Sequence, residues 1–184
     1  SAIGAYRAVL ESDAGNLDAL RGLERLYIRL DNATALLQVL EAQLEYAPTE
    51  RERIKLLTRI GAMQEEQFVK PDLAIERFEQ VLEIDPSDLN ALRSLERLYR
   101  NTARWNELIH TLERHLAATP ERRERVPLFE QMGRVYFDEL RDNDHAEDAF
   151  RNVLDIDPQH LGALESLGKV YEVLDFRSWA EDGQ

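Results

Sequence analysis

Hydrophobic residues recur along the chain at helical spacing, with short polar breaks between the hydrophobic runs. In residues 145–172, Phe150 and Val153 fall on one face of a first helix, and the same spacing resumes after Asp157-Pro158. Asp157 can cap the second helix, and Pro158 suits its first turn because the missing N–H costs nothing there. This stretch therefore predicts two helices joined by a tight turn.

The sequence overlays itself when it is shifted by 72 residues. The pentapeptide LERLY occurs at 23–27 and again at 95–99. Other matched positions are Ile3/Ile75, Tyr6/Phe78/Phe150, Val9/Val81/Val153, Leu20/Leu92/Leu164, Tyr27/Tyr99/Tyr171, Pro48/Pro120 and Gly61/Gly133. Self-similarity on this scale is typical of a solenoid built of stacked supersecondary units.

The pattern predicts ten helices and no strand. Their expected ranges are 2–12, 17–30, 33–46, 50–69, 71–84, 89–101, 104–117, 121–141, 143–156 and 161–174. Thr49 and Glu52 form a capping-box pattern at the start of the fourth helix. Pro127 should kink or delay the eighth, and Trp179 is expected to open a truncated helix after the tenth.

The repeated unit resembles the tetratricopeptide repeat (TPR), a 34-residue helix–turn–helix module. The residues that carry the resemblance in the last copy are Leu164, Leu167-Gly168 and Tyr171 on the first helix, and Ala146, Phe150 and Pro158 on and after the preceding second helix. The resemblance implies an all-α, right-handed α-solenoid of about ten helices. Because the chain begins within the pattern, we expect a piece of a larger, bacterial-type TPR array protein.

The expected organisation is one TPR-like domain over residues 1–184. Its parts are a partial repeat at 1–16, repeats at 17–50, 54–88, 89–122 and 126–160, and a partial repeat at 161–184.

Composition narrows the function. The net charge is −13, from 36 acidic and 23 basic residues, which disfavours nucleic-acid binding. There is no cysteine, no apolar run long enough for a membrane span, and no zinc spacing, phosphate loop or nucleophile elbow. We therefore expect neither an enzyme nor a metal or cofactor site. A cytoplasmic location is favoured for this stretch, and a periplasmic one if the parent protein carries a signal peptide.

The resemblance also implies which residues face a partner. In TPR proteins the first helices line the concave groove, and their second, fifth, ninth and twelfth positions point into it. Here those positions hold eight basic and five acidic residues, although the whole chain is acidic. The candidate partner-binding residues are Arg21, Arg25, Lys55, Arg93, Arg97, Arg100, Arg134, Phe137 and Lys169.

Two questions stay open for these residues. The arginines could be available to a partner, or they could pair with neighbouring glutamates such as Glu24 and Glu96. Those two glutamates stand where the family has a small residue, so we expect their heads to turn to solvent. Phe137 could be exposed in the groove or could pack against a neighbouring helix.

The sequence thus predicts a protein-interaction scaffold that holds a protein or peptide segment, possibly acidic, along its groove. A structural, self-assembling array is the alternative, because both ends present apolar repeat faces. RNA binding is a weaker alternative, because the chain is acidic and no aromatic residues stand among the arginines.

Overall fold

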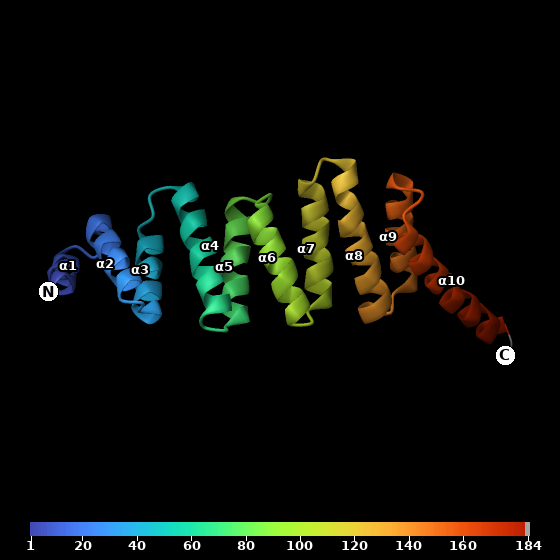
Figure 1. Cartoon of the computed structure of the whole chain (residues 1–184), viewed down its shortest axis with the longest axis horizontal. Coiled ribbons are helices and arrows are strands. Elements are labelled where there is room, and N and C mark those ends of the chain that lie inside the picture. The colour runs from blue at the N-terminus through green and yellow to red at the C-terminus, as the bar shows by residue number, and fades with distance from the viewer. Residues whose placement is uncertain (183–184) are drawn as a thin grey trace. The chain divides into compact units, whose positions relative to one another are not determined.

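The computed structural model describes residues 1–182 and is all-helical over that range (Figure 1). Its α-helices are α1 (Ala2–Ser12), α2 (Leu17–Arg29), α3 (Ala33–Glu45), α4 (Glu50–Glu66), α5 (Pro71–Ile84), α6 (Leu89–Asn101), α7 (Trp105–Ala118), α8 (Val126–Arg134), α9 (Asn143–Ile156) and α10 (Leu161–Asp182). The predicted all-α fold with ten helices is therefore confirmed. Helix boundaries differ from the prediction by more than a few residues at two places.

The first difference is the predicted helix at 121–141, which is divided into three segments. A 3-10 helix, η1 (Arg122–Arg125), precedes α8, and a π-helical segment, η2 (Val135–Leu140), follows it. Pro127 lies in the first turn of α8, the place where a residue without an N–H fits a helix. The predicted delay at Pro127 is confirmed, whereas the π-helix was not foreseen.

The second difference is at the C-terminal end. The predicted break between Leu174 and Trp179 is wrong, because α10 continues without interruption to Asp182. Residues 174–182 contain neither glycine nor proline, so the chain has no strong signal to leave the helix there.

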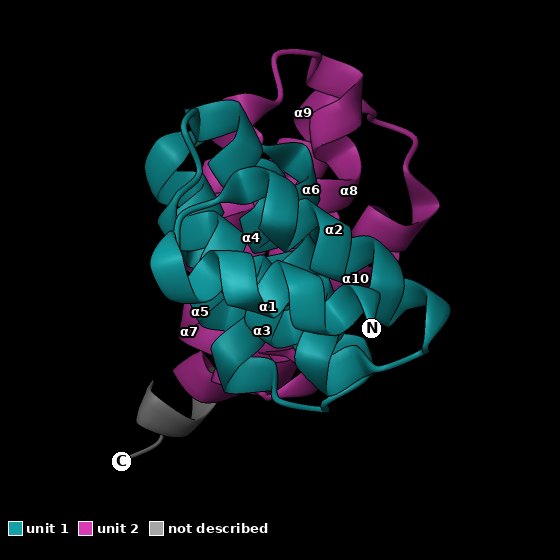
Figure 2. Ribbon diagram, turned by 90° about the vertical axis from the view of Figure 1, so that its left-hand side faces the viewer, with its two compact units in different colours: residues 1–95 teal, residues 96–184 magenta. Residues whose placement is uncertain are grey.

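The chain forms two compact units, residues 1–95 and 96–184, which Figure 2 colours teal and magenta. In the first unit, helices that follow one another in sequence pack together: α1 on α2, α2 on α3, α3 on α4, and α4 on α5. In the second unit, α7 packs on α8, α8 on α9, and α9 on α10. Each unit is therefore built as a helical repeat array, in which burial comes from neighbours in sequence.

The cores lie between successive helices. In unit 1, Leu20, Leu23 and Tyr27 of α2 are buried against residues of α1 and α3. In unit 2, Phe150 and Val153 are buried between elements of the α8–η2 segment and α10. Hydrophobic residues at helical spacing thus form the contacts that their periodicity predicts.

The turn between the two helices of each pair uses a left-handed residue. Asp31, Val69, Ala103 and Arg141 have φ values of 50°, 51°, 53° and 55°. None is glycine, although the left-handed region costs other residues about 1–2 kcal/mol. These turns lie 72 residues apart in pairs, so the strained conformation belongs to the repeat and is held by the packing of both flanking helices.

Candidate functional site

The predicted partner-binding residues all lie on first helices. Arg21 and Arg25 are on α2, Lys55 on α4, the three further arginines on α6, Arg134 on α8, Phe137 in η2 and Lys169 on α10. Every cationic member of this set is exposed, and Phe137 is half-buried. Each unit is considered separately below, because the set is divided between them.

Unit 1 contains a cleft of about 280 Å³ between α2, the C-terminal end of α3 and α4. Four basic and two acidic side chains line the cleft, together with apolar groups from Leu17, Pro48 and Leu56. The basic lining residues are Arg21, Arg25, Lys55 and Arg59, and the acidic ones are Glu24 and Glu52. The cleft is therefore cationic within an acidic chain.

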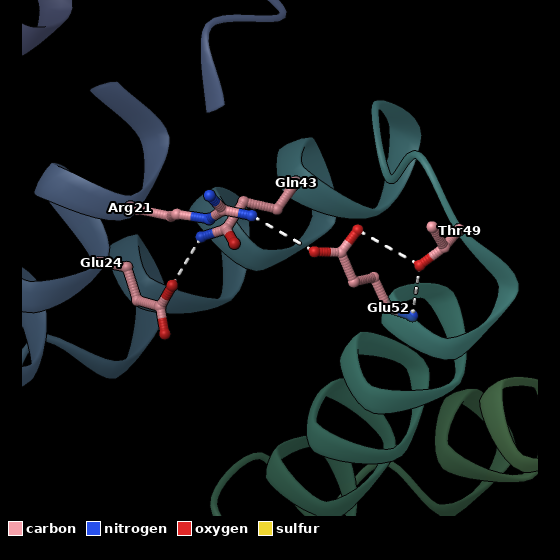
Figure 3. A network of polar contacts seen from close by, with 5 residues as sticks. All are labelled: Arg21, Glu24, Gln43, Thr49 and Glu52. Atoms are coloured by element: carbon pink, nitrogen blue, oxygen red, sulfur yellow. Dashed lines mark hydrogen bonds and ion pairs between the residues drawn. The ribbon is translucent and has the colours of Figure 1, made fainter. Parts of the chain in front are cut away.

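One of these cations is held at the rim. Arg21 Nη2 donates to Glu52 Oε1 at 3.3 Å, and the two side chains remain 47% and 40% exposed (Figure 3). Glu52 also takes part in the predicted capping box, which is confirmed: Thr49 Oγ1 accepts from the Glu52 N–H at 3.2 Å, and Thr49 caps α4. Glu52 thus has two tasks, one at the helix start and one at the cleft.

Glu24 lies deeper and is held more firmly. Its carboxylate accepts from Gln43 Nε2 at 2.7 Å and from the Arg59 guanidinium, and its side chain is 17% exposed. Burial alone would raise the pKa of Glu24, but the hydrogen bonds from Gln43 and Arg59 and the charges of Arg59 and Lys55 together lower it. The prediction that Glu24 turns to solvent is wrong, because internal partners replace water around its carboxylate.

Two cations of the cleft are not bound by the protein itself. Within the described residues, Arg25 makes neither a hydrogen bond nor an ion pair, and Lys55 only lies near enough to Glu24 to influence it. Both side chains are exposed. An anion entering the cleft would therefore find Arg25 and Lys55 ready to receive it.

Unit 2 is arranged differently. Arg100 Nη2 donates to Gln131 Oε1 at 2.6 Å, and Arg134 forms an ion pair with Glu130 one turn earlier on α8. The cleft beside them, about 360 Å³, is lined by two basic residues and by two acidic ones, Asp138 and Glu139. Its charges balance, in contrast to the excess of cations in unit 1.

Glu96 in unit 2 corresponds to Glu24 by the 72-residue shift. It is also buried, contrary to the prediction, and one of its carboxylate oxygens lies 2.5 Å from Nδ1 of His115. His115 itself is buried on α7. Sequence analysis placed His115 at a packing position but did not identify Glu96 as its partner.

The remaining candidates have separate roles. Phe137 packs against the core cluster of unit 2 and borders a second cleft, of about 280 Å³, with Arg134 and Lys169. Arg93 and Lys169 are exposed and have no hydrogen bond or ion pair to other described residues.

The described residues bring together no group of three or more His, Asp or Glu side chains that could hold a metal ion. None of the helices in the described part of the chain is both long enough and apolar enough to span a membrane.

Comparison with known proteins follows from this geometry. Antiparallel helix pairs that stack in sequence order define the class of α-helical repeat proteins. Two family models match, each described as tetratricopeptide repeat, at residues 91–126 and 126–160. The chain belongs to the tetratricopeptide-repeat family.

Solved structures share this fold. A crystal structure of MamA protein is 19% identical, with 89% of this chain and 85% of that chain covered and a TM-score of 0.57. A tetratricopeptide repeat protein from Parabacteroides merdae ATCC 43184 is 18% identical, covering 94% and 62%, with a TM-score of 0.58. YrrB, titled a TPR protein with an unusual peptide-binding site, is 18% identical, covering 89% and 80%, with a TM-score of 0.54. No curated protein matches this chain in sequence.

Proposed function

We propose that this protein is an interaction scaffold that holds an acidic segment of a partner protein against its first helices. Tetratricopeptide repeats are protein-interaction modules, and the fold of YrrB, a related structure, is described as carrying a peptide-binding site. The acidic nature of the partner rests on the charges of the first helices. The partner-binding residues we propose are those listed from the sequence, from Arg21 to Lys169.

The observation that carries the proposal is the unit 1 cleft with its two available cations. Guanidinium and ammonium groups bind carboxylates through charge-assisted hydrogen bonds. Leu17, Pro48 and Leu56 line the same cleft, so a carboxylate beside an apolar side chain would match both parts of its surface. The cleft is small, which suits one or two side chains of an extended segment rather than a whole domain.

The experiment is a selection of random peptides displayed on phage against the purified protein, followed by affinity measurements on the enriched peptides. We expect enrichment of peptides that carry Asp or Glu next to an apolar residue. Their affinity should fall about ten-fold in the double variant Arg25→Gln/Lys55→Gln, because each lost charged hydrogen bond contributes about 1.5 kcal/mol. Affinity should also fall as salt is raised.

A matched control distinguishes the site from general charge. Arg29 and Arg51 lie on the same two helices, are exposed, and do not line the cleft. The variant Arg29→Gln/Arg51→Gln removes the same charge and should keep the affinity within about two-fold, since isolated surface charges contribute little. Selection without acidic enrichment, or equal losses in both double variants, would overturn the proposal.

Self-association is a second candidate, favoured by one observation at the C-terminal end. Leu164 of α10 is 46% exposed, whereas Leu20 and Leu92, its counterparts in the repeat, are 2% and 0% exposed. Light scattering over a range of protein concentration tests this function, and a mass that stays monomeric at high concentration would rule it out.

A further inference from the structure

The ion pair at the rim of the unit 1 cleft joins a residue of the proposed binding surface to a carboxylate of the protein's own α4. We propose that Glu52 is a built-in competitor for this cleft: it occupies Arg21 in the free protein and is displaced by a carboxylate of the bound partner. The inference rests on the proposed function and adds how the site distinguishes its free and bound states.

The two carboxylates of the cleft differ in how easily they could be displaced. Glu52 holds Arg21 through one contact at 3.3 Å between side chains that are nearly half exposed. Exposed pairs of this kind contribute only about 0.2–1 kcal/mol. Glu24, by contrast, is largely buried and has two partners, Gln43 and Arg59. Exchange is therefore expected at Glu52 and not at Glu24.

Position makes the exchange useful. Arg21 and Arg25 are four residues apart on α2 and therefore lie on the same face of the helix. With Lys55 from α4, they line one cleft. Release of Arg21 from Glu52 would raise the number of available cations in the cleft from two to three, all facing one entering segment. Glu52 would remain near Thr49, where it still serves the start of α4.

The substitution that isolates this effect is Glu52→Gln. A glutamine preserves the backbone N–H that donates to Thr49, and its side-chain oxygen can accept from the Thr49 hydroxyl, so the capping box is kept. It removes the charge that competes for Arg21. We expect acidic peptides from the display selection to bind about two- to five-fold more tightly to this variant, as expected from the loss of one exposed ion pair.

A neutral α4 terminus could also attract acidic peptides without any exchange, so two controls are needed. Glu50→Gln removes the same charge two residues earlier, at an exposed position outside the cleft, and should tighten binding less than Glu52→Gln. In an Arg21→Gln background the competitor has nothing to occupy. There, Glu52→Gln should have no larger effect than Glu50→Gln.

The outcomes separate the two proposals. If Arg25→Gln/Lys55→Gln weakens acidic peptides but Glu52→Gln leaves their affinity unchanged or weaker, the exchange is wrong and the binding site stands. An equal gain from Glu52→Gln with and without Arg21 would also overturn the exchange. If no acidic peptide is selected, the proposed function fails, and the exchange fails with it.

Discussion

The two units place a glutamate at the same point of a first helix and neutralise it in different ways. In unit 1, Glu24 is bound by the amide of Gln43 and the guanidinium of Arg59. In unit 2, Glu96 is bound by the imidazole of His115, which occupies the position of Gln43 one repeat later. The backbone therefore fixes where the carboxylate is buried, while the side chain 19 residues further along decides what satisfies it.

This difference reaches the surface. Unit 1 uses Arg59 as one partner of Glu24, and 72 residues later the sequence has Gln131, which instead accepts from Arg100. Lys55 is likewise replaced by Pro127, the residue that delays α8. The two units thus share a helical frame but not a charge pattern, which is why we assign the carboxylate-binding cleft to unit 1 alone.

The largest expected effect concerns how tightly an aromatic ring packs over glycine in each unit. A Cβ added at Gly133 would lie 2.6 Å from the Phe150 ring, whereas one added at Gly61 would lie 3.1 Å from Phe78. Gly133→Ala should lower the free energy of unfolding by about 2–3 kcal/mol through overpacking. Gly61→Ala should cost less than about 1 kcal/mol, because the helix propensity of alanine offsets the crowding.

Urea denaturation followed by circular dichroism measures both values. Gly168 provides the control, because nothing lies within 4 Å of its added Cβ. Gly168→Ala should stabilise the protein by about 0.5–1 kcal/mol. Equal losses at Gly133 and Gly61 would mean that the two units pack their rings equally closely.

The next effect tests the buried pair of unit 2. Glu96→Leu leaves Nδ1 of buried His115 without its partner, and we expect a loss of about 2 kcal/mol in unfolding free energy. Gln43→Leu in unit 1 should cost about 1 kcal/mol, since Glu24 keeps Arg59. The double variant Glu96→Leu/His115→Leu should recover part of the loss. No recovery would show that the cost comes from packing rather than from an unsatisfied ring nitrogen.

A smaller effect is expected at the left-handed turns. Val69 in unit 1 is β-branched, has φ 51° and is 77% exposed, so it contributes strain without burial. Val69→Asn should raise the unfolding free energy by about 0.5–1 kcal/mol, because asparagine tolerates this conformation. Arg141→Asn, at the equivalent turn of unit 2, should gain less. Thermal melts of both variants check the order, and a loss at Val69 would indicate that its side chain packs in solution.

The fold could be predicted from the sequence because its determinants are local. Apolar residues at helical spacing and breaks such as Asp157-Pro158 mark most helix boundaries without reference to contacts. The π-helix η2 was missed because nothing in residues 135–140 distinguishes it from an ordinary helix. The break expected before Trp179 was wrong because it was carried over from the repeat pattern and had no support from local residues.

The site was predictable only in part, for a related reason. Periodicity placed Arg21, Arg25 and Lys55 on exposed faces of first helices, which the structure bears out. It could not reveal that Gln43 and Arg59 meet at Glu24, because these contacts join residues 19 and 35 positions apart. A useful signal was available: Gln43 and His115 are polar residues at equivalent positions of second helices, and each has a glutamate 19 residues earlier.

The smallest expected effect is the pH dependence that Glu24 gives to unit 1. Its folded-state pKa is lowered, because hydrogen bonds from Gln43 and Arg59 outweigh the effect of burial. The unfolded pKa of a glutamate is about 4.3. A group whose pKa is lowered on folding contributes its stability fully above the unfolded pKa and loses it as the pH falls through the folded pKa.

Glu24→Gln removes that contribution, so the difference in melting temperature between wild type and variant should be largest near neutral pH and should shrink as the pH falls below about 4.3. Glu45→Gln is the matched control, because Glu45 is an exposed glutamate of the neighbouring helix α3 with no hydrogen bond or ion pair to the described residues. Its difference from wild type should be small at every pH. A Glu24→Gln difference that stays constant down to acid pH would mean that the network of Gln43 and Arg59 holds the carboxylate no better than water does. The contrast between the two buried glutamates would then lie in packing alone.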